Sequence, residues 1–163
     1  MTVDPDPALG KRLHALAALL PVFEAPGFEF GAWNEPATKD GVMTMPFFMM
    51  SDGARAFFDV CYKQGWVRQD FDWPKWSQTK EYRALAEDPV TLGRATPEQL
   101  ANLVTVMIRQ DRFVEGSLYG DYRSGLIANV LRRAAELEAE LPKVPRKPRK
   151  KADGNQDVEA PEL

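Results

Sequence analysis

The chain has 163 residues, 44% of them hydrophobic with four Trp and nine Phe, which suffices for the core of one ordinary domain without a stabilising disulfide. Its single cysteine excludes an internal disulfide, and one cysteine with one histidine excludes an ordinary Cys/His zinc site. The net charge is −3, no apolar stretch approaches the roughly 20 residues of a membrane span and the acidic start does not resemble a signal peptide, so we expect a soluble, cytoplasmic protein.

The first predicted element is a helix over residues 7–23. Its Leu9, Leu13, Leu16 and Leu20 recur at spacings of three and four residues, which places them on one face. We expect this face to contact the core.

A β-hairpin is predicted next. Residues 28–33 alternate apolar and other side chains, and residues 42–49 form a second β-prone run. The stretch 34–41 between them is rich in turn formers and ends in Asp40-Gly41. We therefore expect two paired strands joined by a long loop.

Helices are predicted for most of the remaining chain, because capping residues precede apolar periodic segments. Ser51 and Asp72 are caps for two of them, and Thr96-Pro97-Glu98-Gln99 has the pattern of a capping box with proline in the first turn. Gly116 separates the third helix from the last one. The predicted ranges are 52–64, 73–86, 97–115 and 118–140, with a loop over 88–95.

Together these elements predict one α+β domain over residues 1–141. It is mostly helical, with a β-hairpin or small antiparallel sheet packed against four or five helices. Prolines and runs of charge predict that residues 142–163 form a disordered tail.

The third of these helices ends in a charged cluster that is the main candidate site. Asp111 and Glu115 project onto the same face as its apolar residues, and a turn at Gly116 brings Arg123 opposite Asp111. We favour an ion-pair network of the two carboxylates with Arg112 and Arg123 that fixes the register of a helical hairpin.

The alternative for this cluster is a binding pocket. Two carboxylates one helical turn apart raise each other's pKa, and a nearby arginine binds anions or carboxylates. The candidate binding residues are Arg109, Asp111, Arg112, Glu115 and Arg123. We predict no metal site, because Asp111 and Glu115 lack a third ligand nearby in the sequence.

Aromatic side chains give a second set of candidates. Trp73 and Trp76 lie three residues apart on one side of a predicted helix, and with Trp33 and Tyr82 they are typical core residues. The functional alternative is a ligand platform built on Trp73 and Trp76.

Other motifs offer little chemistry. His14 is predicted on the solvent side of its helix and Cys61 among apolar residues, so we expect no Cys/His dyad. The sequence has no Gly-rich phosphate loop, no nucleophile elbow and no His-Glu-x-x-His motif, and we expect no cofactor.

The tail is the third candidate site, for nucleic acid. Six basic residues precede four acidic ones there. Proline-spaced lysines next to an acidic end are equally typical of a segment that only confers solubility. The candidate residues are Lys143, Arg146, Lys147, Arg149, Lys150 and Lys151.

The charged cluster also carries a family resemblance. The stretch Thr105 to Gly116, reading TVMIRQDRFVEG, with Gly125-Leu126-Ile127 and Leu131-Arg132-Arg133, resembles the C-terminal signature of the bacterial family DUF6508. Leu20 to Phe23, Trp33 and Pro46-Phe47 are similar to its upstream parts, and Ala134 stands where members usually have Leu. The resemblance covers residues 9–138, implies a single domain and assigns no activity.

We therefore expect a small non-enzymatic binding or adaptor protein of a bacterium or mobile element that acts through protein contacts. The alternatives are an enzyme or small-ligand binder that uses the Arg109 to Glu115 cluster, and a nucleic-acid binder that uses the tail. The sequence predicts no oligomeric state.

Overall fold

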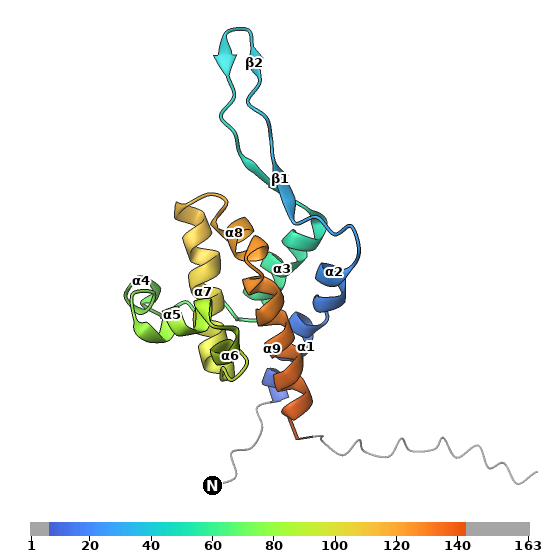
Figure 1. The fold of residues 1–163 in the computed structure, drawn as a ribbon, viewed down its shortest axis with the longest axis vertical. Coiled ribbons are helices and arrows are strands. Elements are labelled where there is room, and N and C mark those ends of the chain that lie inside the picture. Colours follow the sequence, from blue (N-terminus) through green and yellow to red (C-terminus); the bar gives the residue numbers. More distant parts are fainter. Residues whose placement is uncertain (1–6, 143–163) are drawn as a thin grey trace, which may run out of the picture.

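A computed structural model describes residues 7–142, which form a helical body with one long β-hairpin projecting from it (Figure 1). The fold is mostly helical α+β with small antiparallel sheets, as predicted. Within the described residues the helices are α1 (Pro7–Ala17), α2 (Leu20–Glu24), α3 (Asp52–Lys63), α4 (Trp73–Trp76), α5 (Lys80–Glu87), α6 (Pro89–Leu92), α7 (Pro97–Phe113), α8 (Ser117–Arg123) and α9 (Leu126–Glu140).

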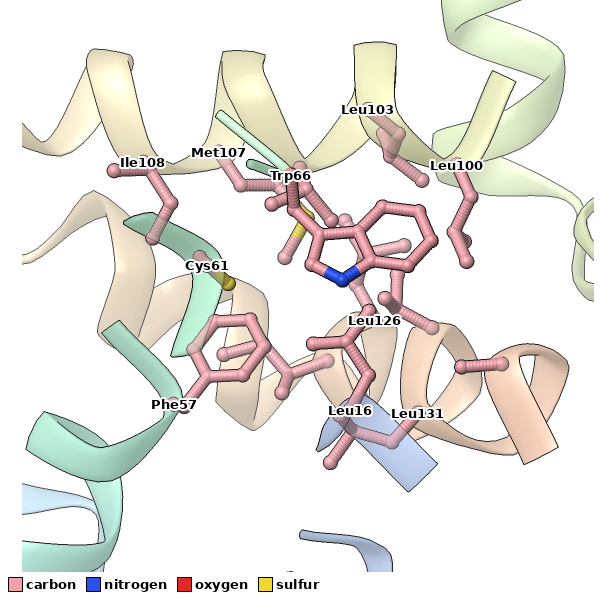
Figure 2. Close-up of a cluster of buried hydrophobic side chains, with 14 of the residues drawn as sticks. Leu16, Phe57, Cys61, Trp66, Leu100, Leu103, Met107, Ile108, Leu126 and Leu131 are labelled. Carbon is pink, nitrogen blue, oxygen red and sulfur yellow. The ribbon is translucent and has the colours of Figure 1, made fainter. Parts of the chain in front are cut away.

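Helix α7 lies at the centre of the body. Every residue from Leu100 to Ile108 is buried, so this helix contacts neighbours on all sides. Helices α1 and α9 pack side by side along their length (Figure 1). The fully buried Trp66, which follows α3, lies at the middle of the core beside Phe57 and Met107 (Figure 2).

Two predicted helices are each divided, for different reasons. Pro21 has no N–H to donate to the carbonyl of Ala17 and its ring would clash there, so residues 7–23 form α1 and α2. Gly125, with φ 87°, interrupts the last predicted helix between α8 and α9. Both glycine and proline thus end regular helix earlier than apolar periodicity alone indicates.

The region between α3 and α7 also differs in detail from its prediction. The predicted helix 73–86 is divided into α4 and α5, because the Thr79 side chain caps a new helix by accepting from the Tyr82 amide (3.2 Å). The predicted loop 88–95 contains α6, which Asp88 caps through Val90 (3.0 Å).

The projecting hairpin, residues 31–50, is here called the arm. Strand β1 (Gly31–Trp33) pairs with β4 (Phe48–Met50), Trp33 opposite Phe48, and β2 (Thr38–Lys39) pairs with β3 (Val42–Met43). Asp40 and Gly41 have φ of 54° and 75°, the pattern of a two-residue type I′ turn. The predicted long loop therefore contains a second short strand pair.

The arm leaves the body at the end opposite to that where α9 ends (Figure 1). The expectation that the whole hairpin packs on the helices is therefore wrong, because only its base contacts them. No helix among residues 7–142 is long and apolar enough to cross a membrane. The predicted tail, apart from Pro142, falls outside the residues that the structure describes.

Candidate functional site

The charged end of α7 does not form the predicted ion-pair network. Among residues 7–142, the side chains of Arg109 and Arg112 make no ion pair or hydrogen bond, and Arg112 is exposed. The Arg123 guanidinium lies over the Tyr119 ring, 5.7 Å from its centroid, instead of against a carboxylate. The network prediction is wrong because it assumed a helix that continued to Glu115.

Helix α7 in fact ends at Phe113, and Val114 has the extended backbone of φ −127° and ψ 92°. This change of direction turns the Glu115 side chain away from the helix face. Its Oε1 accepts a hydrogen bond from the backbone N–H of Phe48 in β4 (2.9 Å). A residue of the family-like signature thus binds the base of the arm.

Gly116 contributes to the same contact. It has φ 89°, which favours glycine, and a Cβ at this position would collide with the indole of Trp33 in β1. Tyr119 of α8 stacks on Phe48, with ring centroids 4.8 Å apart. We call Glu115, Gly116 and Tyr119 the anchor cluster, because together they hold both strands at the arm base.

Asp111 has a different role from the one predicted. Its Oδ1 accepts from the Leu118 backbone N–H (3.0 Å), and it thereby caps α8, whose own N-cap residue Gly116 has no side chain. Asp111 therefore orients α8, the helix that presents Tyr119 to the arm.

The structure places a second carboxylate, Asp121, next to Asp111. Burial, followed by the negative charge of Asp111, raises the pKa of Asp121 from its usual 3.8 to about 7. Burial, with Asp121 and Glu87 nearby, also raises the pKa of Tyr82 on α5. The like-charge pair that we predicted for Asp111 and Glu115 is thus formed by Asp111 and Asp121, and sequence analysis missed Asp121.

The two tryptophan candidates pack in separate groups and do not contact each other within the described residues. Trp73 lies against Phe113 at the end of α7 (6.0 Å between centroids). Trp76 lies against Phe71 and Tyr82 (5.8 and 5.6 Å). Both tryptophans are half-buried. Trp76 packs against the core, whereas Trp73 lies on Phe113, which is 77% exposed, so the core prediction is correct for Trp76 alone.

His14 and Cys61 have the environments expected for them. His14 is exposed, and its Nδ1 lies 2.7 Å from Glu138 Oε1. Cys61 is fully buried, and burial raises the pKa of its thiol, which keeps it protonated and unreactive. Across residues 7–142, no three His, Cys, Asp or Glu side chains are grouped so that they could hold a metal ion.

The basic candidates of the tail cannot be placed. Lys143, Arg146, Lys147, Arg149, Lys150 and Lys151 all lie outside the described residues. Their predicted contact with nucleic acid therefore stays a prediction.

The arm itself is the feature that sequence analysis did not identify as a site. Six of the ten large apolar side chains exposed within residues 7–142 belong to it, although it is a small part of the chain. The arm therefore exposes an apolar surface that nothing else in the described chain covers, and residues 34–47, between β1 and β4, are here called its outer part. The six are Trp33, Val42, Met43, Met45, Phe47 and Met49.

The contacts of the cluster predict opposite outcomes for two neighbouring substitutions. We expect Glu115→Ala to lower the free energy of unfolding by about 1.5 kcal/mol, because it removes a hydrogen bond to a charged acceptor at the arm base. Arg112→Ala should change it by less than about 0.5 kcal/mol, because that side chain is exposed and without a partner in the described chain. Urea unfolding of both variants measures the difference. A loss of several kcal/mol in Arg112→Ala would contradict this expectation and support the ion-pair network predicted from the sequence.

Comparison with known proteins agrees with the sequence resemblance. No curated protein and no solved structure matches the sequence. The family model of DUF6508, a family of unknown function, matches residues 8–140, a range that includes all of α1 to α9 except Pro7, the arm and the anchor cluster. The chain therefore belongs to the DUF6508 family.

Proposed function

We propose that this protein is a non-enzymatic binding module that captures another protein through the apolar outer part of its arm. The observation that carries the proposal is the exposure of large apolar side chains on a projecting hairpin. Met43 is 69% and Met45 77% exposed. Contiguous exposed apolar surface of this kind marks sites of protein contact in soluble domains.

The side-chain chemistry of the arm favours a protein partner. Methionine is flexible and polarisable, and it fills irregular apolar grooves. From Gly41 to Met50 the arm has no charged side chain, which excludes strong attraction to a phosphate backbone at this surface. The complementary partner surface is an apolar groove or a sheet edge to which the arm adds a strand.

The contacts that hold the base of the arm support the same function. Its base is held by the Phe48 to Glu115 hydrogen bond and by the Phe48 ring stacked on Tyr119. A hairpin held in this way loses less conformational freedom on binding than a free loop does. The anchor cluster therefore prepares the arm for capture without itself contacting the partner.

The experiment compares the full chain with Met43→Ser/Met45→Ser as bait in an extract of the native bacterial host. We expect the double variant to lose capture of a specific partner by at least about tenfold, because two apolar side chains no longer leave water on binding. Val90→Ser is the matched control, since Val90 is also exposed (64%) but lies on α6. It should capture the partner as the unaltered chain does.

Three outcomes would overturn the proposal. These are equal capture by the Met43→Ser/Met45→Ser variant, equal loss in Val90→Ser, and a dimer of this chain that the double variant abolishes, which would assign the arm to self-association. Thermal unfolding of each bait excludes misfolding as the cause of a loss.

Three other functional predictions from the sequence stay predictions. They are an enzymatic or small-ligand-binding role of the Arg109 to Glu115 cluster, nucleic-acid binding by the tail, and a cytoplasmic location. Removal of residues 142–163 from the bait tests whether the tail takes part in capture, because capture through the arm does not require the tail.

A further inference from the structure

A cavity of about 350 Å³ lies between α1, the segment that follows α3 and the first turns of α7. This volume is within the range of small-ligand pockets. Leu9, Pro97 and Ala101 line its apolar part, and Arg12, Arg68 and Glu98 are its charged residues. The cavity shares no lining residue with the anchor cluster or the arm.

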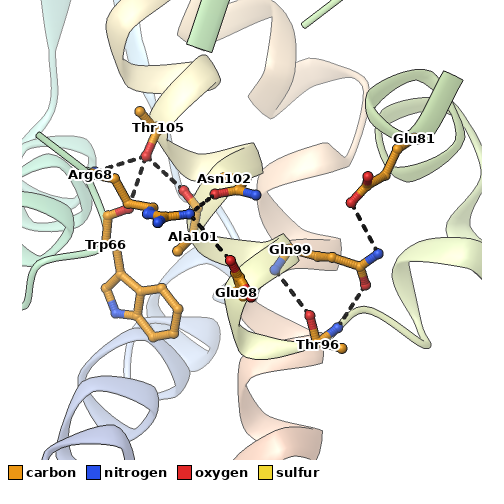
Figure 3. A network of polar contacts seen from close by, with 9 residues as sticks. All are labelled: Trp66, Arg68, Glu81, Thr96, Glu98, Gln99, Ala101, Asn102 and Thr105. Carbon is orange, nitrogen blue, oxygen red and sulfur yellow. Dashed lines mark hydrogen bonds and ion pairs between the residues drawn. The ribbon is translucent and has the colours of Figure 1, made fainter. Parts of the chain in front are cut away.

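Arg68 is held in place by several contacts (Figure 3). Its Nη1 donates to Asn102 Oδ1 (2.6 Å) on α7, and its backbone N–H donates to the buried Thr105 hydroxyl (2.9 Å). Its guanidinium lies over the Phe71 ring (5.1 Å). Within residues 7–142, its Nε and Nη2 donate to no acceptor, and this edge has the fork geometry that binds a carboxylate or phosphate with two hydrogen bonds.

Arg12, the second cation of the cavity lining, is fixed by a separate set of contacts. Its Nε and Nη2 donate to the backbone oxygens of Gln64 and Gly65 (2.7 and 3.3 Å). Its guanidinium stacks on Trp66 (4.6 Å), whose Nε1 donates to the Arg12 carbonyl (3.1 Å). Arg12 Nη1 has no acceptor among the described residues. Both guanidiniums are therefore ordered before any ligand arrives, which lowers the entropic cost of binding.

The charges at the cavity are not balanced. Two guanidiniums face one carboxylate, Glu98, which is 76% exposed and whose Oε1 lies 3.7 Å from Arg68 Nη1. An exposed pair at this distance is weak, and one carboxylate against two guanidiniums leaves the site with a net positive charge. The backbone amide of Gln99 at the start of α7 is already bonded to the Thr96 hydroxyl (3.1 Å), so this amide is not a donor to the cavity.

We propose that this cavity binds a small organic anion. Its carboxylate or phosphate group lies between Arg12 and Arg68, and its apolar part contacts Leu9, Pro97 and Ala101. The site is independent of the arm, since α1 begins at the end of the body opposite to the arm (Figure 1).

The test is calorimetric titration of the full chain with benzoate, phenyl phosphate and inorganic phosphate. We expect saturable binding of benzoate or phenyl phosphate, and weaker binding of inorganic phosphate because it makes no apolar contact. The stronger of the two organic probes identifies the source of the oxyanion as a carboxylate or a phosphate ester.

Variants assign the binding to the two arginines. Arg68→Gln should weaken the preferred probe about tenfold or more, and Glu98→Gln should tighten it because it removes the competing negative charge. Arg68→Lys keeps the charge but not the planar fork, so it should also weaken binding and serves where Arg68→Gln does not fold. Arg55→Gln is the matched control, because Arg55 is exposed on α3 and does not line the cavity.

The proposal is overturned if neither organic probe saturates. It is equally overturned if folded Arg68→Gln or Arg68→Lys binds the preferred probe within twofold of the unaltered chain. Loss of binding in Arg55→Gln would show general charge attraction and would also contradict the assignment.

Discussion

Gly116→Ala is expected to lower the free energy of unfolding by about 2–5 kcal/mol and to loosen the arm base. About 1–2 kcal/mol comes from the left-handed backbone that a residue with a Cβ adopts at a cost. A further 1–3 kcal/mol, approximately, comes from the collision of the new methyl group with the Trp33 ring. The Trp33 indole must move, and with it the pairing of β1 and β4.

Gly125→Ala is the matched control for this substitution. Gly125 has nearly the same φ, 87° against 89°, but a Cβ there would meet no atom within 4 Å. It should therefore show the backbone cost alone. Chemical unfolding measures the free energy of unfolding of both variants. Equal losses in the two would show that the contact with Trp33 does not contribute to the effect of Gly116→Ala.

Asp121→Asn is expected to stabilise the protein at pH 8 by about 2–4 kcal/mol. Burial and the negative charge of Asp111 raise the pKa of the Asp121 carboxyl from its usual 3.8 to about 7. At pH 8 the folded protein therefore contains an ionised carboxylate in an unfavourable environment, and a neutral amide of the same shape removes this cost.

The sign of the pH dependence follows from the same shift. Between about pH 4 and pH 7 the folded state binds the Asp121 proton and the unfolded state has released it, so the stability of the unaltered chain falls as the pH rises through this window. Asp121→Asn should abolish that part of the slope and differ little from the unaltered chain at pH 4. Asp59→Asn, at an exposed position of α3, is the control. Urea unfolding at pH 4, 6 and 8 measures the effect, and a parallel slope in both variants would contradict it.

Local signals in the sequence predicted the helix starts well. The capping box at Thr96 and Gln99 forms with both of its hydrogen bonds (3.1 and 3.0 Å), and the Ser51 side chain accepts from the Ala54 amide (3.2 Å) as a cap should. These contacts join residues three apart, so their physical cause lies within a few residues of sequence. Asp40-Gly41 was placed in the hairpin connection for the same reason, although as the end of a long loop and not as a two-residue turn.

The partners of the charged cluster could not be predicted in this way. Glu115 accepts a hydrogen bond from the Phe48 amide, 67 residues away in the sequence. The helical projection placed Glu115 on the apolar face of the helix, but α7 ends two residues earlier, at Phe113. A helix start near Leu118 was predicted, but the Asp111 side chain was assigned to Arg123 and not to the Leu118 amide that it caps. A non-local donor, the Phe48 amide, and the end of α7 before Glu115 together determine this site, and neither has a signal in local periodicity.

The arm had a signal that periodicity does not measure. The run from Val42 to Met50 contains four methionines, no charge and one proline, which is apolar enough for a buried strand. We assigned residues 42–49 to a hairpin packed on the helices, because the run is β-prone and follows a turn-rich stretch. The short β2 and β3 strands pair only with each other, so most of that run stays exposed.

The most direct test of the central claim, that the end of α7 anchors the arm, is the amide hydrogen-exchange rate of Phe48. In the unaltered chain this N–H is bonded to Glu115 Oε1 (2.9 Å). We expect Glu115→Ala to accelerate exchange at Phe48 about tenfold, corresponding to the loss of about 1.4 kcal/mol of protection, and Arg112→Ala to leave it unchanged. Unchanged exchange at Phe48 in Glu115→Ala, or equal acceleration in both variants, would contradict the claim.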